Sequence, residues 1–363
     1  MNSKPRIVDT FCGAGGFALG ARAVGLAPSI SFDIDPILTS SVKYNFPETE
    51  LVLADLATIS GSDIERQVGG QVDGIFGGPP CQAFSAMGYR QADDPRRSLL
   101  GHFFRLVSEL RPAFFVLENV QGLTYPDALP VLQRGLDLLD GRYDLVGPMI
   151  LDASDFGAAT RRPRLFVIGY DAVRCDPISV TDIEKLKQPA ATVADAISDL
   201  STAVFERDEE GYDIWKLASA GSKSHYARRM WAPDLIFTGH RKTKHTEDVV
   251  SRFAALEPGT VDRVGRHPRL AWGGQCPTLR AGTGSDRGSF QAVRPVHPDE
   301  HRVITVREGA RLQGFPDRFR FHSTVWHSFR MIGNSVSPII AEAILSEVSR
   351  KIGILATSRV AAE

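Results

Sequence analysis

Two residues stand out because their types and surroundings suit covalent chemistry. Cys81 ends the stretch Gly-Gly-Pro-Pro-Cys at 77–81, whose glycines and prolines predict a stiff, exposed turn. This is an unusual place for a structural cysteine, because free cysteines are usually buried. Glu118 follows the apolar run 114–117, where partial burial should raise its pKa and make it a proton donor near neutral pH. These residues predict a presented thiol nucleophile and a general acid. The alternatives are an inert loop cysteine and a capping or ion-paired glutamate.

A glycine-rich turn, Phe-Cys-Gly-Ala-Gly-Gly at 11–16, follows the first expected strand. Such a turn lets the backbone approach a ligand and aims helix amides at it. Asp33 lies 20 residues after Gly13, where dinucleotide folds place a carboxylate on ribose, and Asp35 and Asp55 end neighbouring segments. The loop lacks a full GxGxxG, so an adenosyl ligand without pyrophosphate is favoured over a nicotinamide cofactor. A ligand-free turn and helix-capping acids are the alternatives.

Short apolar runs alternate with helix-length segments through the first 170 residues, and this alternation must position the residues above. The expected strands are 7–8, 29–32, 51–53, 74–76, 113–117, 143–150 and 165–169. Segments 36–45 and 98–110 have helical spacing, with Ser98 as a candidate cap. This order predicts an α/β fold with a doubly wound, mainly parallel sheet, whose ligands bind at the carboxyl ends of the strands.

The alternation ends near residue 172, where glycine, proline, arginine and histidine become frequent. We therefore expect a catalytic and cofactor-binding domain at 1–171, a smaller irregular domain at 172–301, and a C-terminal segment at 302–363 that returns to the first domain. Helices are expected at 306–314 and 339–352.

Composition describes an ordinary globular chain of 363 residues with a formal charge of −1 and a pI near 6.8. No run approaches the roughly 18–20 apolar residues of a membrane span, and no leader pattern follows Met1. The four cysteines, 12, 81, 175 and 276, are too dispersed for a disulfide framework. A cytoplasmic location with reduced thiols is expected.

Six motifs in one order resemble the DNA (cytosine-5) methyltransferases of bacterial type, over residues 6 to about 345. They are Phe-Cys-Gly-Ala-Gly-Gly at 11–16, Pro-Pro-Cys-Gln at 79–82, Glu-Asn-Val at 118–120, Arg-Pro-Arg at 162–164, Thr-Val-Arg-Glu at 305–308 with Leu-Gln-Gly-Phe-Pro at 312–316, and Gly-Asn-Ser-Val at 333–336.

The resemblance implies the S-adenosylmethionine-dependent methyltransferase fold, that cofactor with S-adenosylhomocysteine as product, no metal, and attack of Cys81 on C6 of cytosine. The implied catalytic residues are Cys81, Glu118, Asn119, Arg162 and Arg164. The implied cofactor-binding residues are Phe11, Gly13, Gly15, Asp33, Asp55, Pro79, Asn334 and Ser335, with the last two folding back beside the first strand. Phosphate-binding or surface ion-paired roles are the alternatives for the two arginines.

The chain departs from the family pattern in two places. Ala159-Thr160 stands where the family usually has Pro-Gln before its arginine pair, and Asp33 stands where a glutamate is common. Neither departure removes a reacting group. They concern contacts to the target strand and the cofactor.

Access to a cytosine inside a duplex requires base flipping, which costs a few kcal/mol. The polar segment 82–97 suits a lid over the flipped base, or a plain surface loop.

Residues 214–294 hold 14 Lys and Arg against 6 Asp and Glu, a net +8, whereas residues 172–213 carry a net −6. The basic stretch 214–294 predicts a DNA-facing surface in a target-recognition domain. The predicted nucleic-acid-binding residues are Gln82, Ser85, Arg97, Arg228, Arg241, Thr278, Leu279 and Arg280.

The partners expected are double-stranded DNA and, acting separately, a restriction endonuclease, with the chain itself a monomer. Alternative functions are a tRNA cytosine-5 methyltransferase, a catalytically silent DNA-binding regulator and a nicotinamide dehydrogenase. The histidine pairs 240 and 245, 297 and 301, and 322 and 327 lack a completing ligand set, so zinc is not expected.

Overall fold

The computed structural model describes residues 4–80, 97–218, 224–281 and 294–353. The chain divides into two compact units. The first comprises Met1–Asp152, Pro163–Lys187 and Pro338–Glu363, and the second comprises Ala153–Arg162 and Gln188–Ser337. Residues 302–337 thus belong to the second unit. The functional division into 1–171, 172–301 and 302–363 stays a prediction.

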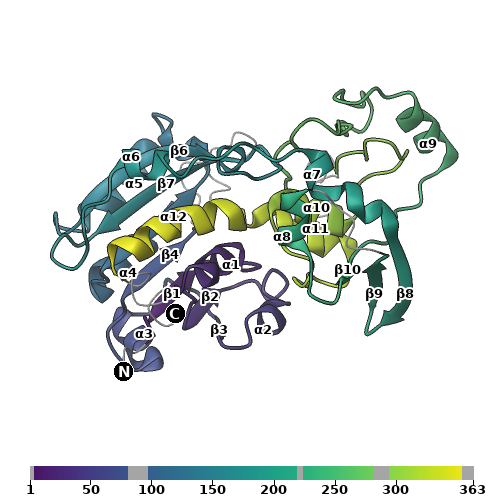
Figure 1. Cartoon of the computed structure of the whole chain (residues 1–363). Helices are drawn as coiled ribbons and strands as arrows, with labels where there is room; N and C mark the ends of the chain where they lie inside the picture. Colours follow the sequence, from purple (N-terminus) through teal and green to yellow (C-terminus); the bar gives the residue numbers. More distant parts are fainter. Residues whose placement is uncertain (1–3, 81–96, 219–223, 282–293, 354–363) are drawn as a thin grey trace. The chain divides into compact units, whose positions relative to one another are not determined.

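The first unit is built on a seven-stranded sheet in the order β3-β2-β1-β4-β5-β7-β6 (Figure 1). The strands β1 to β5 pair in parallel, whereas β7 runs antiparallel to both β5 and β6. The mainly parallel sheet predicted from the alternation is therefore confirmed. Its strands are β1 Ile7–Thr10, β2 Ile30–Asp33, β3 Glu50–Leu53, β4 Gly74–Gly77, β5 Phe114–Asn119, β6 Asp144–Asp152 and β7 Pro163–Tyr170.

Helices flank this sheet and bury its apolar residues. Phe115 of β5 packs edge-on against Phe103 and Phe104 of the helix that precedes this strand. The helices of this unit are α1 Gly16–Ala23, α2 Val42–Asn45, α3 Gly61–Val68, α4 Arg97–Leu110, the 3-10 turn η1 Gln121–Thr124, α5 Leu129–Asp137, α6 Val180–Glu184 and α12 Pro338–Lys351.

The chain's C-terminal helix packs against its first helix (Figure 1). A Cβ on Gly20 of α1 would lie 2.7 Å from the Cβ of Ala341 and 2.8 Å from the carbonyl oxygen of Pro338, so α1 and α12 approach closely only because Gly20 has no side chain. The helix expected at 339–352 is confirmed, and it packs against α1 and α6.

Two local expectations are wrong. Helical structure in 36–45 is confined to α2, because the Asp35 carboxylate accepts hydrogen bonds from the amides of Ile37 and Leu38 and holds a turn there. Ser98 lies inside α4 rather than before it, because the helix already includes Arg97.

The second unit carries a three-stranded antiparallel sheet in the order β10-β9-β8, which the apolar pattern of the sequence does not predict. Glu210 and Gly211, with φ of 52° and 82°, form the two-residue turn between β8 and β9. The elements are η2 Ala153–Asp155, α7 Val193–Ile197, η3 Ser198–Thr202, β8 Ala203–Glu209, β9 Tyr212–Leu217, α8 His225–Met230, β10 Ile236–Thr238, α9 Glu247–Ala254, α10 Val306–Gln313 and α11 Val325–Asn334. Helix α10 confirms the expectation at 306–314.

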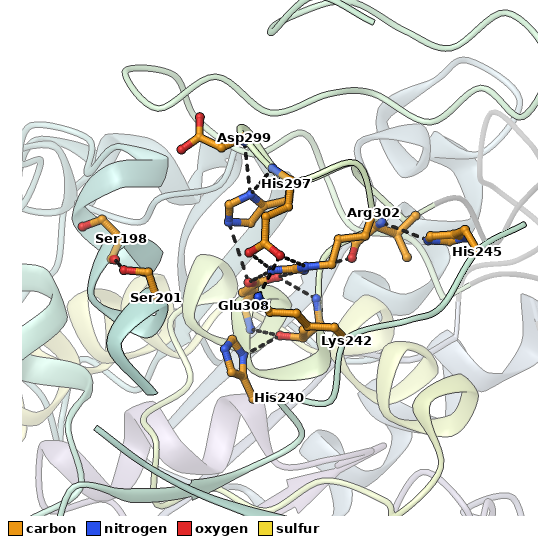
Figure 2. Close-up of polar contacts among 12 residues, drawn as sticks. Ser198, Ser201, His240, Lys242, His245, His297, Asp299, Arg302 and Glu308 are labelled. Atoms are coloured by element: carbon orange, nitrogen blue, oxygen red, sulfur yellow. Dashed lines mark hydrogen bonds and ion pairs between the residues drawn. The ribbon is translucent and has the colours of Figure 1, made fainter. Parts of the chain in front are cut away.

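A buried polar cluster fixes the start of α10 (Figure 2). The Arg302 guanidinium donates to both carboxylate oxygens of Glu308, at 2.8 and 2.9 Å, and Glu308 also accepts from the Thr305 amide at 2.7 Å. Burial alone would raise the pKa of Glu308, but the hydrogen bonds and charge of Arg302 lower it to about 2. His240 Nδ1 lies 3.0 Å from Thr305 Oγ1, and burial lowers the pKa of this imidazole to about 4. The cluster therefore favours a charged carboxylate and a neutral histidine.

Across the described ranges, no helix is long and apolar enough to cross a membrane.

Candidate active site

The carboxyl ends of β4 and β5 bring the predicted proton donor beside the turn that leads to the predicted nucleophile. Asn119 at the end of β5 donates from Nδ2 to the carbonyl of Pro79 at 3.2 Å, and its Oδ1 accepts from the Val120 amide at 2.9 Å. Cys81 itself lies outside the described residues. Asn119 thus anchors the backbone two residues before Cys81.

Glu118 is 8 % exposed and forms an ion pair with Arg164, whose Nε lies 3.1 Å from Glu118 Oε1. The two residues come from β5 and β7, which are antiparallel neighbours. A Cβ on Gly78 would lie 2.9 Å from Glu118 Oε2, so glycine at 78 leaves room for the carboxylate. Burial of Glu118 agrees with expectation, and its ion pair with Arg164 matches the ion-paired alternative. The role of Glu118 as proton donor stays a prediction.

The other described cysteines are poor nucleophiles. Cys12, Cys175 and Cys276 are buried and free, and burial raises the pKa of each thiol, in Cys175 to about 11. A buried, protonated thiol is chemically inert compared with a thiolate.

The glycine loop has the backbone of a ligand-binding turn. Phe11 adopts φ of 56°, a left-handed conformation that is uncommon outside glycine and that recurs at functional sites. Gly13 has φ of 52°, and a Cβ there would meet nothing within 4 Å. At Gly15, with φ of 87°, a Cβ would collide with the Phe46 ring. The space beside Gly13 is open, whereas Gly15 is required for packing.

Asp33 links the end of β2 to the glycine loop. Its Oδ2 accepts from the Gly13 amide at 2.8 Å and its Oδ1 from the Asp35 amide at 2.9 Å. Burial raises the pKa of Asp33 despite these hydrogen bonds. Each oxygen accepts one of these hydrogen bonds, and a carboxylate oxygen can accept two, as binding to two ribose hydroxyls requires.

The other two predicted acids serve local turns. Asp35 caps the turn before α2, and the Oδ1 of exposed Asp55 accepts from the Ala57 amide at 2.9 Å. The capping alternative therefore describes the contacts that these two carboxylates make.

Asp9, at β1, is absent from the predicted site residues. Its side chain is 1 % exposed, and neither carboxylate oxygen has a hydrogen-bond partner among the described residues. Burial, followed by the charge of Asp33, raises its pKa well above the ordinary value. The signal in the sequence is an acid within the first strand, two residues before the glycine loop.

Comparison with known proteins assigns this arrangement to a family. The family model of the C-5 cytosine-specific DNA methylases matches residues 5–350. The chain belongs to this family. The expected identity and the methyltransferase fold are therefore confirmed, and the chain is a DNA cytosine-5 methyltransferase.

Individual relatives agree. The chain is 40 % identical over 375 residues to the Type II methyltransferase M.XorII of Xanthomonas oryzae pv. oryzae, covering 96 % of this chain and 85 % of that protein. It is 31 % identical to M.DdeI of Desulfomicrobium norvegicum, covering 94 % and 88 %. A crystal structure described as a DNA modification methyltransferase encoded within a prophage (E. coli) has a TM-score of 0.84 and 37 % identity, covering 96 % of this chain and 99 % of that one.

In this cytosine methylase, Arg162 lies in the second unit and is 2 % exposed. Its guanidinium donates to the carbonyls of Leu279, Gly333 and Ser335. Its predicted partner in catalysis, Arg164, lies in the first unit with Glu118. The two arginines of the motif thus make different contacts.

The late motif, Gly-Asn-Ser-Val at 333–336, lies at the end of α11 in the same unit as Arg162. Asn334 is exposed, whereas Ser335 is 6 % exposed and its hydroxyl donates to the Met331 carbonyl at 2.7 Å. Their role in cofactor binding stays a prediction.

The predicted DNA contacts of the methylase fall into three groups. Gln82 and Ser85 lie outside the described residues, as does the side chain of Arg97 at the start of α4. Arg228, Arg241 and Arg280 are exposed. Thr278 donates to the Arg161 carbonyl at 2.6 Å, and Leu279 is 3 % exposed, so the latter contributes mainly packing and backbone.

Ion pairs neutralise part of the positive charge in the predicted recognition domain. Arg241 forms an ion pair with Asp208 of the acidic stretch, and Lys242 pairs with Glu300 at 2.7 Å. Arg269 is 7 % exposed and donates to backbone carbonyls rather than facing solvent. The net +8 therefore overstates the free positive charge of this stretch.

Several histidines considered for zinc make structural hydrogen bonds. His297 Nδ1 accepts from the amides of Asp299 and Glu300, and His245 Nε2 accepts from the Val303 amide (Figure 2). Within the described ranges, no group of three or more His, Cys, Asp or Glu suits a metal ion. The expectation that no metal is needed remains a prediction.

Proposed function

We propose that this DNA cytosine-5 methyltransferase transfers a methyl group from S-adenosylmethionine to C5 of a flipped cytosine in a specific double-stranded sequence, within a Type II restriction-modification setting. The observation that carries the proposal is the constellation at the ends of β4, β5 and β7. Glu118 is paired with Arg164, and Asn119 holds the Pro79 backbone that leads to Cys81. The setting is supported by the names of the Type II relatives.

The residues beside β1 and β2 fit the proposed cofactor. Open space at Gly13, the left-handed turn at Phe11 and the remaining acceptor capacity of Asp33 suit an adenosyl group, and the unpartnered Asp9 carboxyl suits a polar ligand atom nearby. S-adenosylmethionine would supply an electrophilic methyl group. The proposed cofactor-binding residues are Phe11, Gly13, Gly15, Asp33, Asp55 and Pro79 of the first unit, and Asn334 and Ser335 of the second.

Exposed Ile34 extends this set. It stands between Asp33 and Asp35 and is 68 % exposed, an unusual state for a large apolar side chain at the end of a buried strand. An apolar surface next to the ribose-binding acid suits the face of an adenine ring. The sequence signal is an isoleucine flanked by two aspartates.

Cys81 supplies the nucleophile in the proposed reaction. Its thiolate forms a bond to C6, and the π electrons of the C5–C6 bond move toward C5, where the ring becomes nucleophilic. After C5 is methylated, a base removes the C5 proton, the double bond re-forms, and the bond from C6 to sulfur breaks. The thiolate is regenerated. The inert character of the other three cysteines supports this assignment.

Glu118 and Arg164 act on the ring rather than on the nucleophile. Glu118 donates a hydrogen bond or proton to cytosine N3, which stabilises the electron-rich ring. Arg164 orients Glu118 and offers a guanidinium to the pyrimidine, and Asn119 positions the turn before Cys81. Arg162, whose guanidinium donates to the carbonyls of Leu279, Gly333 and Ser335, acts on the base through the backbone that it holds.

DNA recognition is assigned to the second unit together with the segment after Cys81. Gln82, Ser85 and Arg97 would lie near the flipped base, and Arg228, Arg241, Thr278, Leu279 and Arg280 would contact DNA. A separately acting endonuclease, a monomeric state and a cytoplasmic location complete the proposal.

Methyl transfer from a tritiated donor to cytosine-containing duplex DNA tests the proposal. We expect incorporation by the wild-type chain, none by Cys81→Ser, and preference for duplex DNA over tRNA in competition. Bisulfite sequencing of a plasmid from an expressing host then identifies the recognition sequence. No incorporation by the wild type, or unchanged incorporation by Cys81→Ser, contradicts the proposal.

A further inference from the structure

Arg162 holds together two segments that the proposed function assigns to different ligands. Its Nη1 donates to the carbonyl of Leu279 at 3.2 Å, and its Nη2 donates to the carbonyls of Gly333 at 2.8 Å and Ser335 at 2.7 Å. Leu279 lies in residues 276–281, the recognition segment, which carries the predicted DNA contacts Thr278, Leu279 and Arg280. Gly333 and Ser335 are the residues on either side of Asn334, a proposed cofactor ligand. The three acceptors come from two segments that are more than 50 residues apart in sequence.

The backbone around Arg162 reinforces this link. Segment 159–162 runs parallel to the recognition segment, with the amide of Cys276 donating to the Ala159 carbonyl at 2.9 Å and the amide of Arg161 donating to the Cys276 carbonyl at 2.8 Å. Thr160 Oγ1 also donates to the Cys276 carbonyl at 3.1 Å. The segment that carries Arg162 is thus hydrogen-bonded to the chain leading into Thr278 and Leu279.

Gly333 brings the late motif against the same recognition segment. A Cβ on Gly333 would lie 2.7 Å from the Cα of Ala281, and still closer to the Ala281 nitrogen and the Arg280 carbonyl carbon. The atoms in the way are backbone, which has little freedom to move aside. The backbone at 280–281 therefore rests directly on the late motif, and a shift in one displaces the other.

The carbonyl of Ser335 is held from a second side. Gln313 Nε2 donates to it at 3.1 Å, and the Ser337 hydroxyl donates to the Gln313 carbonyl at 2.8 Å. Arg162 therefore joins a rigid arrangement at the end of α11 rather than a loose turn.

We propose that Arg162 is a positioning residue that couples DNA binding to cofactor binding, by holding the backbone of the recognition segment and of the late motif in one hydrogen-bonded arrangement. This inference rests on the proposed function, because it takes Asn334 and Ser335 as cofactor ligands and residues 278–280 as DNA ligands. A planar guanidinium suits the task, since its fork donates to several carbonyls at fixed angles, whereas a lysine ammonium has no such fork. Coupling of this kind is reciprocal: each ligand tightens binding of the other by the same factor.

The experiment measures the dissociation constant of S-adenosylhomocysteine by calorimetry, with and without a duplex that carries the recognition sequence found by bisulfite sequencing. For the wild type, we expect DNA to tighten binding by roughly 5-fold or more, the lower end of typical coupling. In Arg162→Lys, DNA should tighten product binding by no more than about twofold, and the dissociation constant of the product without DNA should rise.

Arg307→Lys is the matched control. Arg307 is 0 % exposed in the same unit and likewise donates to three carbonyls, those of Thr238, Pro316 and Phe319, but none belongs to the recognition segment or the late motif. A merely structural role for Arg162 predicts that both variants lose stability and keep the wild-type factor. The proposal is overturned if DNA tightens product binding in Arg162→Lys as much as in the wild type, or if Arg307→Lys loses this tightening to the same extent as Arg162→Lys.

A measurement on the wild type covers the case in which Arg162→Lys fails to fold. Hydrogen exchange of the amides at 278–281 should slow on addition of S-adenosylhomocysteine alone, without DNA. Unchanged exchange at these amides in a chain that binds the product overturns the coupling. A wild type that neither binds the product nor methylates DNA contradicts the proposed function instead.

Discussion

The carboxylate of Glu118 on β5 is joined to the guanidinium of Arg164 on the neighbouring antiparallel strand β7, with 3.1 Å between Oε1 and Nε. Both side chains are largely buried, at 11 % and 16 % exposure. A guanidinium in this position fixes the direction of the carboxylate and remains able to offer donors to a ligand, because it carries five N–H groups. The pair therefore behaves as one polar unit beside the turn that leads to Cys81.

The first prediction concerns the proton donor. Glu118→Gln keeps the size of the side chain but removes its acid, so the turnover number should fall by about 10²- to 10⁴-fold while cofactor affinity changes little. Single-turnover methylation measures the chemical step. Glu109→Gln is the control, because Glu109 also pairs with an arginine, Arg105, at 2.8 Å but away from the site. Wild-type turnover in Glu118→Gln contradicts the assigned role.

The second prediction tests whether Glu118 and Arg164 act together. Arg164→Lys keeps a positive charge but loses the planar fork, and misplacement of a catalytic group by about 1 Å costs on the order of 10²-fold in rate. In the double variant with Glu118→Gln, the losses should be smaller than the product of the single effects, since both changes disrupt the same pair. A double-mutant cycle on the methylation rate gives the coupling. Simple multiplication of the two effects would show that the residues act independently.

The third prediction separates two glycines of the loop. Gly13→Ala places a Cβ in open space, so the variant should fold, at a backbone cost of about 1–2 kcal/mol for its left-handed conformation, and bind S-adenosylhomocysteine more weakly. Gly15→Ala drives a Cβ into the Phe46 ring and should chiefly lower the free energy of unfolding. Urea unfolding and product-binding titrations of both variants measure the two effects. Equal binding by Gly13→Ala and the wild type argues against a ligand in that space.

Much of the first unit is predictable from sequence because its order is local. The buried strands β2 and β5 carry Asp33 and Glu118 at their carboxyl ends, where ligands bind in such sheets, and Gly69 ends α3 in the left-handed conformation typical of a helix C-cap. The β8–β9 hairpin is harder to predict, because most residues of β8 are exposed and give no alternating pattern. Its signal is the turn at Glu210-Gly211.

The contacts of Arg162 show what a motif alone does not contain. Arg162 and Arg164 are two residues apart, yet one donates to carbonyls more than 100 residues distant in sequence and the other pairs with Glu118. Tertiary packing determines this division of roles. In the same way, the pairing of Arg241 with Asp208 depends on the hairpin that the sequence pattern misses.

The fourth prediction concerns acid stability of the second unit. Burial lowers the pKa of His240 from 6.5 to about 4, so between these values the unfolded chain binds more protons than the folded one. The free energy of unfolding should therefore fall as the pH drops below about 6.5, with the loss from this group complete below about 4. At 1.36 kcal/mol per pKa unit, the loss attributable to His240 is about 3 kcal/mol. The neutral imidazole also faces Thr305 Oγ1, 3.0 Å away, at the start of α10.

Urea unfolding at pH 7 and pH 5 measures this loss. His240→Gln retains a hydrogen-bonding side chain that does not titrate, so the difference in unfolding free energy between the two pH values should shrink. His225→Gln, at an exposed position on α8, should leave the wild-type difference unchanged. His297 and His245, whose pKa values burial also lowers, continue to contribute in both variants, so the difference shrinks without vanishing. An undiminished difference in His240→Gln would show that protonation of this imidazole does not drive the acid loss.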